Sequence, residues 1–279
     1  MKTLVGKIAV VTGASRGVGK GVALGLAEAG ATVYVTGRTV DPGTGPDGLP
    51  GTIKETAAQV TAFGGRGTYL HCDHRNDEET EAVFSRIITE SKRIDILVNA
   101  VWGGYEHMVE KGERTWTRPF WHQPFWRWDA MFQAGVRAYY VASAIAARTM
   151  VEQESGLIVN ISYWAGQKHI GNSAYGVARA AIDKLTAYTA EELKEHSVAA
   201  VALYPGLVRT ESVMRDAKEY DLSNSESPQF SGRAVTGLAT DPRLMEKTGR
   251  VFAAADLAKE YGFTDVDGKE PKPVSIHEG

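Results

Sequence analysis

Apolar and polar residues follow one another along this chain in blocks of two kinds. Short runs rich in valine, isoleucine and alanine are typical of buried strands, and the longer segments between them have helical length and composition. The strand-like runs cover 7–12, 32–36, 67–72, 94–99, 156–162 and 198–204, with a weaker one at 249–254. Strands that alternate with helices predict a parallel sheet with helices on both faces. We therefore expect a doubly wound α/β fold with a mostly parallel sheet, in a single domain spanning 1–279.

A glycine-rich turn follows the first predicted strand. Gly13, Gly17 and Gly19 separate the run at 7–12 from a helical segment at 20–29. This order brings backbone N–H groups and a helix N-terminus up to a pyrophosphate, with glycine where a side chain would block the approach. The next strand completes a βαβ unit, so the pattern predicts nucleotide binding. The residues expected to line the nucleotide here are Gly13, Ser15, Arg16, Gly17, Val18 and Gly19.

A tyrosine and an arginine are the first candidates for catalysis. Tyr175 and Arg179 are four residues apart at the start of an apolar-striped segment, which places them on one face of a helix. A fixed positive charge favours phenolate and lowers a tyrosine pKa from its ordinary value of about 10. Such a phenol can exchange a proton with a carbonyl oxygen or an alcohol. The spacing alone is usually that of a solvated surface pair, so other evidence is needed.

Several motifs occur in the order that is found in a known family: Thr12-Gly13-x-x-x-Gly17-x-Gly19, Asp73, Asn99-Ala100, Tyr175-Gly-Val-Ala-Arg179 and Pro205-Gly206. Over nearly its whole length the chain resembles the short-chain dehydrogenases/reductases. The resemblance implies a Rossmann-type sheet, a nicotinamide cofactor, carbonyl/alcohol chemistry and a homodimer or homotetramer. Most of these motifs also lie at predicted carboxyl ends of strands, where ligands bind in such sheets.

The second predicted strand indicates which nicotinamide cofactor is preferred. An acidic side chain after this strand bonds the ribose 2′-OH of NAD, whereas an arginine attracts the 2′-phosphate of NADP. The strand here is followed by Arg38, with no acid before Asp41, and Arg16 of the glycine turn can approach the same phosphate. We therefore expect NADP(H). The resemblance adds these residues to the cofactor site: Asp73, His74, Asn99, Ala100, Tyr175, Arg179, Pro205, Gly206, Val208 and Thr210.

The serine that the family uses to hold the substrate oxygen has two candidates. Counting back from Tyr175 by the family's usual spacing leads to Ser162. Aligning the segment 161–166 with the family's Ile-Ser-Ser-x-x-Gly leads instead to Tyr163. We favour Ser162, and Tyr163 remains an alternative because its phenol can also donate a hydrogen bond to the substrate oxygen.

Two further family positions are altered. Arg179 stands where a lysine is expected, and arginine is charged but effectively never deprotonated. Gly135, with Gln133 nearby, stands where the family has an asparagine that holds a relay water. These changes leave two functions open. The first is an NADP(H)-dependent oxidoreductase that interconverts a carbonyl and a secondary alcohol, and the second is a catalytically impaired NADP-binding sensor or assembly subunit.

Two irregular segments are expected near the substrate. Segment 101–128 contains five of the six tryptophans together with tyrosine and phenylalanine. Its aromatic side chains either pack internally or at an oligomer contact, or form an apolar wall over the substrate, which would then be apolar or aromatic. Segment 207–231 follows Pro205-Gly206 and resembles the family's substrate loop or lid.

Composition excludes several other classes. With 43% apolar residues and a formal charge of −3, nothing favours nucleic acid or an anionic membrane as a partner. No apolar run approaches the roughly 20 residues that span a bilayer, so we expect a cytoplasmic protein with a small-molecule substrate. The single cysteine and the scattered histidines show no metal-ligand spacing, so no metal is expected.

Overall fold

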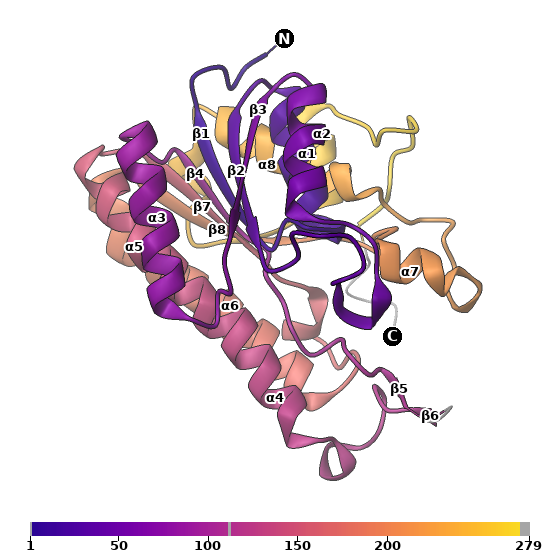
Figure 1. Ribbon diagram of the computed structural model, residues 1–279. Coiled ribbons are helices and arrows are strands. Elements are labelled where there is room, and N and C mark those ends of the chain that lie inside the picture. Colours follow the sequence, from indigo (N-terminus) through magenta and orange to yellow (C-terminus); the bar gives the residue numbers. More distant parts are fainter. Residues whose placement is uncertain (1, 111–112, 274–279) are drawn as a thin grey trace.

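The computed structural model describes residues 2–110 and 113–273. Its main element is a sheet of seven parallel strands, and this confirms the predicted α/β class (Figure 1). In spatial order the strands are β3 (Arg66–His71), β2 (Thr32–Gly37), β1 (Ile8–Thr12), β4 (Ile96–Asn99), β7 (Gly156–Ile161), β8 (Val198–Tyr204) and β9 (Val251–Ala253). The order reverses between β1 and β4, and in sheets of this kind ligands bind outside the carboxyl ends of the strands at that point.

Helices cover both faces of the sheet (Figure 1). One face is covered by α1 (Gly17–Glu28), α2 (Ile53–Ala62), α8 (Pro228–Thr240) and α9 (Ala254–Tyr261), and the other by α3 (Asp77–Ser91), α5 (Ala138–Glu152) and α6 (Ser173–Leu193). In β1 the side chains of Ala9 and Val11 pack in the core between the sheet and α1, whereas Val10 packs in the core on the side of α3 and α5. A strand buried on both faces needs apolar residues at every position, which explains the continuous apolar runs.

Polar residues meet at the carboxyl edge of the sheet because of the strand register. Thr12 at the end of β1 pairs with Thr36 of β2 and with Asn99 of β4. Asn99 pairs in turn with Asn160 of β7. The parallel register therefore brings the residues that follow these strands to one edge, as the motif positions predicted.

Glycines allow α1 and α8 to pack unusually closely. A Cβ atom added at Gly25 of α1 would lie 2.5 Å from the carbonyl carbon of Gly232 in α8. A Cβ at Gly21 would likewise lie 2.0 Å from the backbone of Pro228. The start of α8 therefore lies against the first turns of α1, and this brings the segment before α8 close to the glycine turn.

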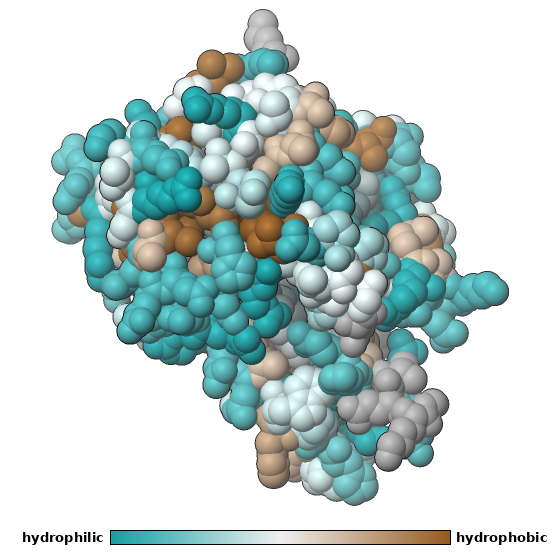
Figure 2. All heavy atoms as spheres, in the orientation of Figure 1, coloured by the Kyte–Doolittle hydropathy of each residue, from teal (hydrophilic) through white to brown (hydrophobic). Residues whose placement is uncertain are grey.

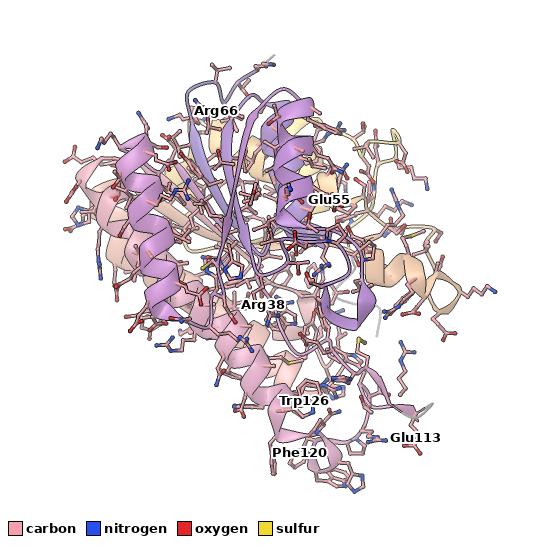
Figure 3. The ribbon with its side chains drawn as sticks, in the orientation of Figure 1. Arg38, Glu55, Arg66, Glu113, Phe120 and Trp126 are labelled. Atoms are coloured by element: carbon pink, nitrogen blue, oxygen red, sulfur yellow. The ribbon has the colours of Figure 1, made fainter. Side chains whose placement is uncertain are left out.

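The aromatic segment is folded around a buried arginine. It contains the antiparallel pair β5 (Val109–Glu110) and β6 (Glu113–Arg114) and leads into α4 (Phe125–Met131). The Arg127 guanidinium donates to the Thr115 carbonyl and hydroxyl and to the His107 carbonyl, and lies 5.1 Å from the Trp126 ring centroid. Figure 3 shows this segment projecting at the lower end of the molecule, where Phe120 and Trp126 are labelled, and Figure 2 shows the same projection in a space-filling view. Arg127 thus replaces an apolar core as the centre of the segment.

Two features are absent from the part of the chain that the structure describes. No helix there has both the length and the apolar character required to cross a bilayer. No group of three or more His, Cys, Asp or Glu side chains in the same residues is placed to hold a metal ion.

Candidate active site

The glycine turn has the geometry of an anion site. Gly13 and Gly17 have positive φ angles of +66° and +58°. A Cβ at Gly13 would lie 2.5 Å from the Val101 Cα atom, and one at Gly19 would lie 2.4 Å from the Gly13 oxygen, so neither position accepts a larger residue. Ser15 is buried beside the turn and Val18 packs against the core of the α1 face. The turn therefore presents backbone atoms and the first N–H groups of α1.

A carboxylate occupies this helix N-terminus. The Gly17 N–H donates to Oε2 of Glu211 at 2.8 Å. Glu211 is the first residue of the short helix α7 (Glu211–Arg215), whose N-terminus is capped by the Thr210 hydroxyl. The Glu211 carboxylate shows that this N–H can donate to an anionic oxygen, and a phosphate oxygen is an acceptor of the same kind. Sequence reasoning missed Glu211, although an acid at the first turn of a predicted lid was a usable signal.

The two arginines of the predicted phosphate site have different environments. Arg16 donates to the carbonyls of Pro50 and Gly51 at 2.9 and 2.8 Å, and burial lowers its pKa. Arg38 is exposed at the carboxyl end of the sheet, as its label in Figure 3 shows. Arg38 is close enough to both Arg16 and Asp73 to affect their pKa values. Arg16 is thus engaged in holding the loop before α2, while Arg38 faces outward.

Asp73 is also engaged by a neighbour. Its carboxylate receives hydrogen bonds from the Arg75 guanidinium at 2.5 to 3.1 Å. This interaction with Arg75 lowers the pKa of Asp73 to about 2. The carboxylate is therefore ionised at neutral pH, and a contact with adenine would have to share it with Arg75.

Three predicted nucleotide contacts can be made only through the backbone. The buried Asn99 amide donates to the Ser143 hydroxyl and the Asn160 oxygen at 2.9 and 2.8 Å. The His74 ring is buried against Thr36, and burial lowers its pKa to about 4. Both side chains, like the Ala100 methyl, have structural neighbours, so a nucleotide would meet the main chain at these positions.

Tyr175 is the third residue of α6 and is enclosed by aromatic rings. Its N–H donates to the Asn172 side chain, which caps the helix, and the Asn172 amide donates to the Trp116 carbonyl at 3.1 Å. These bonds fix the start of α6 against the aromatic segment. The rings whose centroids lie within 5.2 to 6.2 Å of the Tyr175 ring are Trp116, Trp102, Tyr105 and Tyr163.

Arg179 reaches Tyr175 through a second tyrosine. Its Nη2 donates to the Tyr105 hydroxyl at 3.3 Å, and that hydroxyl donates to Tyr175 Oη at 3.2 Å. Nη1 of Arg179 donates to the Ile161 carbonyl at 3.0 Å. The structure thus brings the predicted pair together, with the guanidinium 5.1 Å from the Tyr175 ring centroid, and the hydrogen bonds between them run through the Tyr105 hydroxyl. The sequence placed Tyr105 in an aromatic segment and gave no signal for this role.

The expected lowering of the Tyr175 pKa is wrong for this structure. Burial raises the pKa of Tyr175 well above its ordinary value, and the neighbouring Tyr105 phenol raises it further. The Arg179 charge acts in the predicted direction and lowers the pKa. Desolvation of the charged phenolate outweighs that attraction, because the ring is 5% exposed.

The two candidates for the substrate-binding hydroxyl point in different directions. The buried Ser162 hydroxyl donates to the Arg179 carbonyl at 3.3 Å and also bonds Asp183. Tyr163 is partly buried, and its ring lies beside that of Tyr175. Ser162 is therefore directed toward α6 and Tyr163 toward the aromatic cluster.

The two residues that depart from the family pattern, Gly135 and Arg179, both pack against Trp102. Gly135 lies in a π-helical turn, Phe132–Arg137, and a Cβ there would lie 2.6 Å from Cζ3 of Trp102. The Arg179 guanidinium lies 3.6 Å from the centroid of a Trp102 ring. The indole of Trp102 thus fills the space beside Gly135 and stacks on Arg179. A planar guanidinium suits this stacking, whereas a lysine ammonium does not.

A buried acid lies below the Pro205-Gly206 motif. A Cβ at Gly206 would lie 2.7 Å from Oε1 of Glu226, which also accepts the Gly206 N–H. Val208 and Glu226 form a backbone bridge, so the residues after β8 are held in place. Burial raises the pKa of Glu226 to about 7. Sequence reasoning missed this residue, which lies in a polar, serine-rich segment.

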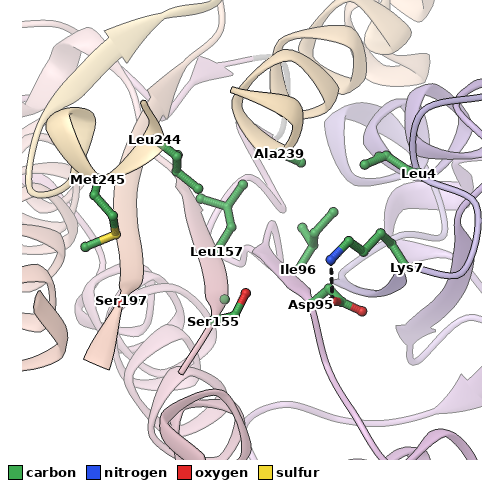
Figure 4. Close-up of a pocket in the computed structure, with 11 residues that line it drawn as sticks. Leu4, Lys7, Asp95, Ile96, Ser155, Leu157, Ser197, Ala239, Leu244 and Met245 are labelled. Carbon is green, nitrogen blue, oxygen red and sulfur yellow. Dashed lines mark hydrogen bonds and ion pairs between the residues drawn. The ribbon is translucent and has the colours of Figure 1, made fainter. Parts of the chain in front are cut away.

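A hollow at the other end of the sheet is separate from this site. It is lined by residues at the amino ends of β4 and β7, with Leu4, Leu244 and Met245 around it (Figure 4). Lys7 and Asp95 form an ion pair at its rim, with a 3.0 Å separation. None of the motifs described above contributes to its lining, so we assign it no role in the site.

Comparison with known proteins agrees with this geometry. The family model described as short chain dehydrogenase matches residues 7–221, so the chain belongs to the short-chain dehydrogenase family. It is 40% identical to dehydrogenase/reductase SDR family member 1 of Mus musculus over 96% of this chain and 85% of that protein. The Homo sapiens protein of the same name is 38% identical over 95% of this chain and 84% of its own length. A crystal structure of a metagenomic short-chain oxidoreductase in complex with NADP has a TM-score of 0.70, with 26% identity over 90% of this chain and 97% of that one.

Proposed function

We propose that this chain is an NADP(H)-dependent oxidoreductase that interconverts a carbonyl and a secondary alcohol on an apolar or aromatic substrate. The observation that supports it best is the hydrogen-bonded series Arg179–Tyr105–Tyr175, at the same edge of the sheet as the glycine turn. In this proposal Tyr175 gives the proton to the substrate oxygen in reduction and takes it back in oxidation. A bound nicotinamide would supply or accept the hydride.

The residues around the glycine turn fit a dinucleotide. The Gly17 N–H would hold a phosphate oxygen in place of the Glu211 carboxylate, and the exposed Arg38 would bond the 2′-phosphate. The residues after β8 would hold the carboxamide side, as the family resemblance implies: Pro205, Gly206, Val208 and Thr210. The NADP bound to the metagenomic relative supports this choice of cofactor.

The substrate class follows from the surroundings of Tyr175. Trp102, Trp116 and Tyr163 pack around it together with Ile170. The Arg179 cation beside these rings already bonds Tyr105 and the Ile161 carbonyl. A charged substrate group would lose its hydration there and would have to compete for that cation, so an apolar or aromatic carbonyl compound is the better match. Of the two hydroxyl candidates, Tyr163 is the one that would hold the substrate oxygen, because Ser162 already bonds α6.

The same proposal includes the wider organisation. The chain would act as one domain, with segment 101–128 on the substrate side and segment 207–231 as the lid. Arg209 and Asp265 form an ion pair that ties this lid to the C-terminal part of the chain. We place the protein in the cytoplasm as a homodimer or homotetramer, without nucleic-acid or membrane partners.

Two measurements test the proposal. Oxidation of NADPH with a panel of aryl and alkyl ketones should give turnover in the parent protein and none in Tyr175→Phe, whereas exposed Tyr188→Phe should behave as the parent. Calorimetric titration should show tighter binding of NADPH than of NADH, and Arg38→Glu should remove that preference. Tighter NADH binding by the parent, or full activity of Tyr175→Phe, would contradict the proposal.

The catalytically impaired NADP-binding protein is the second candidate function. It is favoured by the bonds that already engage the Arg179 guanidinium and the Ser162 hydroxyl. The same titration discriminates between the two functions. Micromolar or tighter NADPH binding without turnover on the whole panel would favour the sensor or assembly subunit.

A further inference from the structure

Tyr105 is a partly exposed residue whose hydroxyl bonds a buried phenol. Tyr175 is 5% exposed, whereas Tyr105 is 42% exposed. The Tyr105 hydroxyl lies 3.2 Å from Tyr175 Oη and donates to it. Because a phenol oxygen both donates and accepts, Tyr175 can receive this bond and still direct its own proton to a substrate oxygen. Tyr105 is thus a partly exposed residue whose hydroxyl bonds the buried Tyr175.

A buried acid/base needs a partner that restores its proton after each turnover. In this chain Arg179 stands at the position of the family's lysine, and an arginine cannot release a proton at accessible pH. Gly135 stands at the position of the family's asparagine. The space beside Gly135 is filled by Trp102. The side chains that would connect Tyr175 to solvent in the family pattern are therefore replaced by groups that do not exchange protons.

We propose that Tyr105 is a second proton-transfer residue, which passes the proton between Tyr175 and solvent and takes over the relay of the missing lysine and asparagine. This inference rests on the proposed function. It assigns to the aromatic segment a chemical role in addition to that of an apolar wall.

The step balances in the direction of carbonyl reduction. As the substrate carbon receives a hydride, the Tyr175 proton moves to the carbonyl oxygen and leaves a phenolate on Tyr175. The Tyr105 O–H then gives its proton to Tyr175, and the resulting Tyr105 phenolate takes a proton from water or a buffer acid. One hydride and one proton are consumed for each alcohol formed, and alcohol oxidation reverses every transfer.

Arg179 is placed to assist the transfer without taking part in it. Its Nη2 hydrogen bond to Tyr105 Oη stabilises the phenolate form of Tyr105. The other titratable groups near this series include Tyr163 beside Tyr175 and Tyr139 of α5 near Arg179, and burial raises the pKa of both. Asp183 and Tyr204 also lie close enough to interact with the Arg179 charge, and burial raises their pKa values as well. Tyr105 therefore has a cation hydrogen-bonded to the oxygen on which negative charge develops during the transfer.

The test separates proton transfer from packing. Tyr105→Phe keeps the ring and removes the hydroxyl, and Tyr69→Phe is a matched control because Tyr69 is also 42% exposed and lies in β3. We expect Tyr105→Phe to lower kcat by about 10² or more, with a changed solvent isotope effect and partial rescue by small buffer acids. Calorimetry should show NADPH affinity within about twofold of the parent, which reports an intact cofactor site.

A second variant keeps both shape and hydrogen bonds. A fluorotyrosine incorporated at position 105 has a more acidic phenol, so the basic limb of the pH–rate profile should move to lower pH. An unchanged profile with fluorotyrosine, or a Tyr105→Phe protein with parental kcat and isotope effect, would overturn the relay. The proposed function would still stand in that case, provided that Tyr175→Phe is inactive. Absence of turnover in the parent protein on every ketone would reject both.

Discussion

Glu211 competes with the cofactor for the N-terminus of α1. Its carboxylate accepts the Gly17 N–H at 2.8 Å, the position at which a dinucleotide phosphate is expected. A cofactor phosphate must break this bond and then lies near a displaced negative charge. Glu211→Gln keeps the size and an acceptor oxygen but removes the charge. We therefore expect this substitution to strengthen NADPH binding.

The size of the effect follows from the type of bond. A hydrogen bond to a charged group contributes about 1.5–3 kcal/mol and a neutral one about 0.5–1.5, so the substitution should recover about 1–2 kcal/mol. This corresponds to roughly a 5- to 30-fold lower Kd for NADPH. Part of the difference should disappear at high salt, because the site is partly exposed.

Calorimetry of the parent, Glu211→Gln and Glu219→Gln measures this difference directly. Glu219 belongs to the same lid, is exposed and has the same charge, so Glu219→Gln controls for the general change in net charge. We expect it to leave the Kd within about twofold of the parent value. If Glu211→Gln binds NADPH no more tightly than Glu219→Gln, the carboxylate does not occupy a phosphate position and the reasoning fails.

Substitutions at three further residues test other parts of the structure. Arg179→Lys should lose the stacking on Trp102 but keep the charge. Arg179→Met should lower kcat more and move the basic limb of the pH–rate profile to higher pH. Superimposable profiles of the parent and Arg179→Met would exclude Arg179 from the mechanism. The folded-state pKa of His74 is about 4, below the unfolded value of about 6.5, so the unfolded chain binds the proton first and stability is lost as pH falls through this window. Urea unfolding should show a loss of about 2 kcal/mol from this group between pH 7.5 and pH 5, and a His74→Gln protein should lack that increment. Arg127→Met should remove the guanidinium's hydrogen bonds to the Thr115 and His107 carbonyls, cost about 2 kcal/mol and speed proteolysis within segment 101–128. An unchanged cleavage rate would contradict the assigned role.

The fold was predictable because its signals are local. The apolar run of β1 and the glycine turn after it each depend on neighbouring residues, and their order along the chain implies the parallel sheet. Boundaries were less accurate. Helix α1 begins at Gly17, before the expected start at residue 20, because the turn's glycines already form its first turn.

The site was only partly predictable because its decisive contacts join distant residues. Tyr105 and Tyr175 are 70 positions apart, and Gly17 and Glu211 are 194 apart. Neither pairing leaves a periodic trace in the sequence. The pKa of Tyr175 was misjudged for a related reason, since a charge four residues away is visible in the sequence and the enclosing rings are not.

The transfer of a labelled hydride tests the proposed chemistry most directly. NADPH that contains deuterium at the transferable C4 position should deliver it to the carbonyl carbon of an aryl ketone, and mass spectrometry of the alcohol detects it. We expect singly deuterated alcohol from the parent protein and none above background from Tyr175→Phe. Unlabelled alcohol, or equal labelling by the two proteins, would show that Tyr175 is not the acid/base of a hydride-transfer reaction in this site.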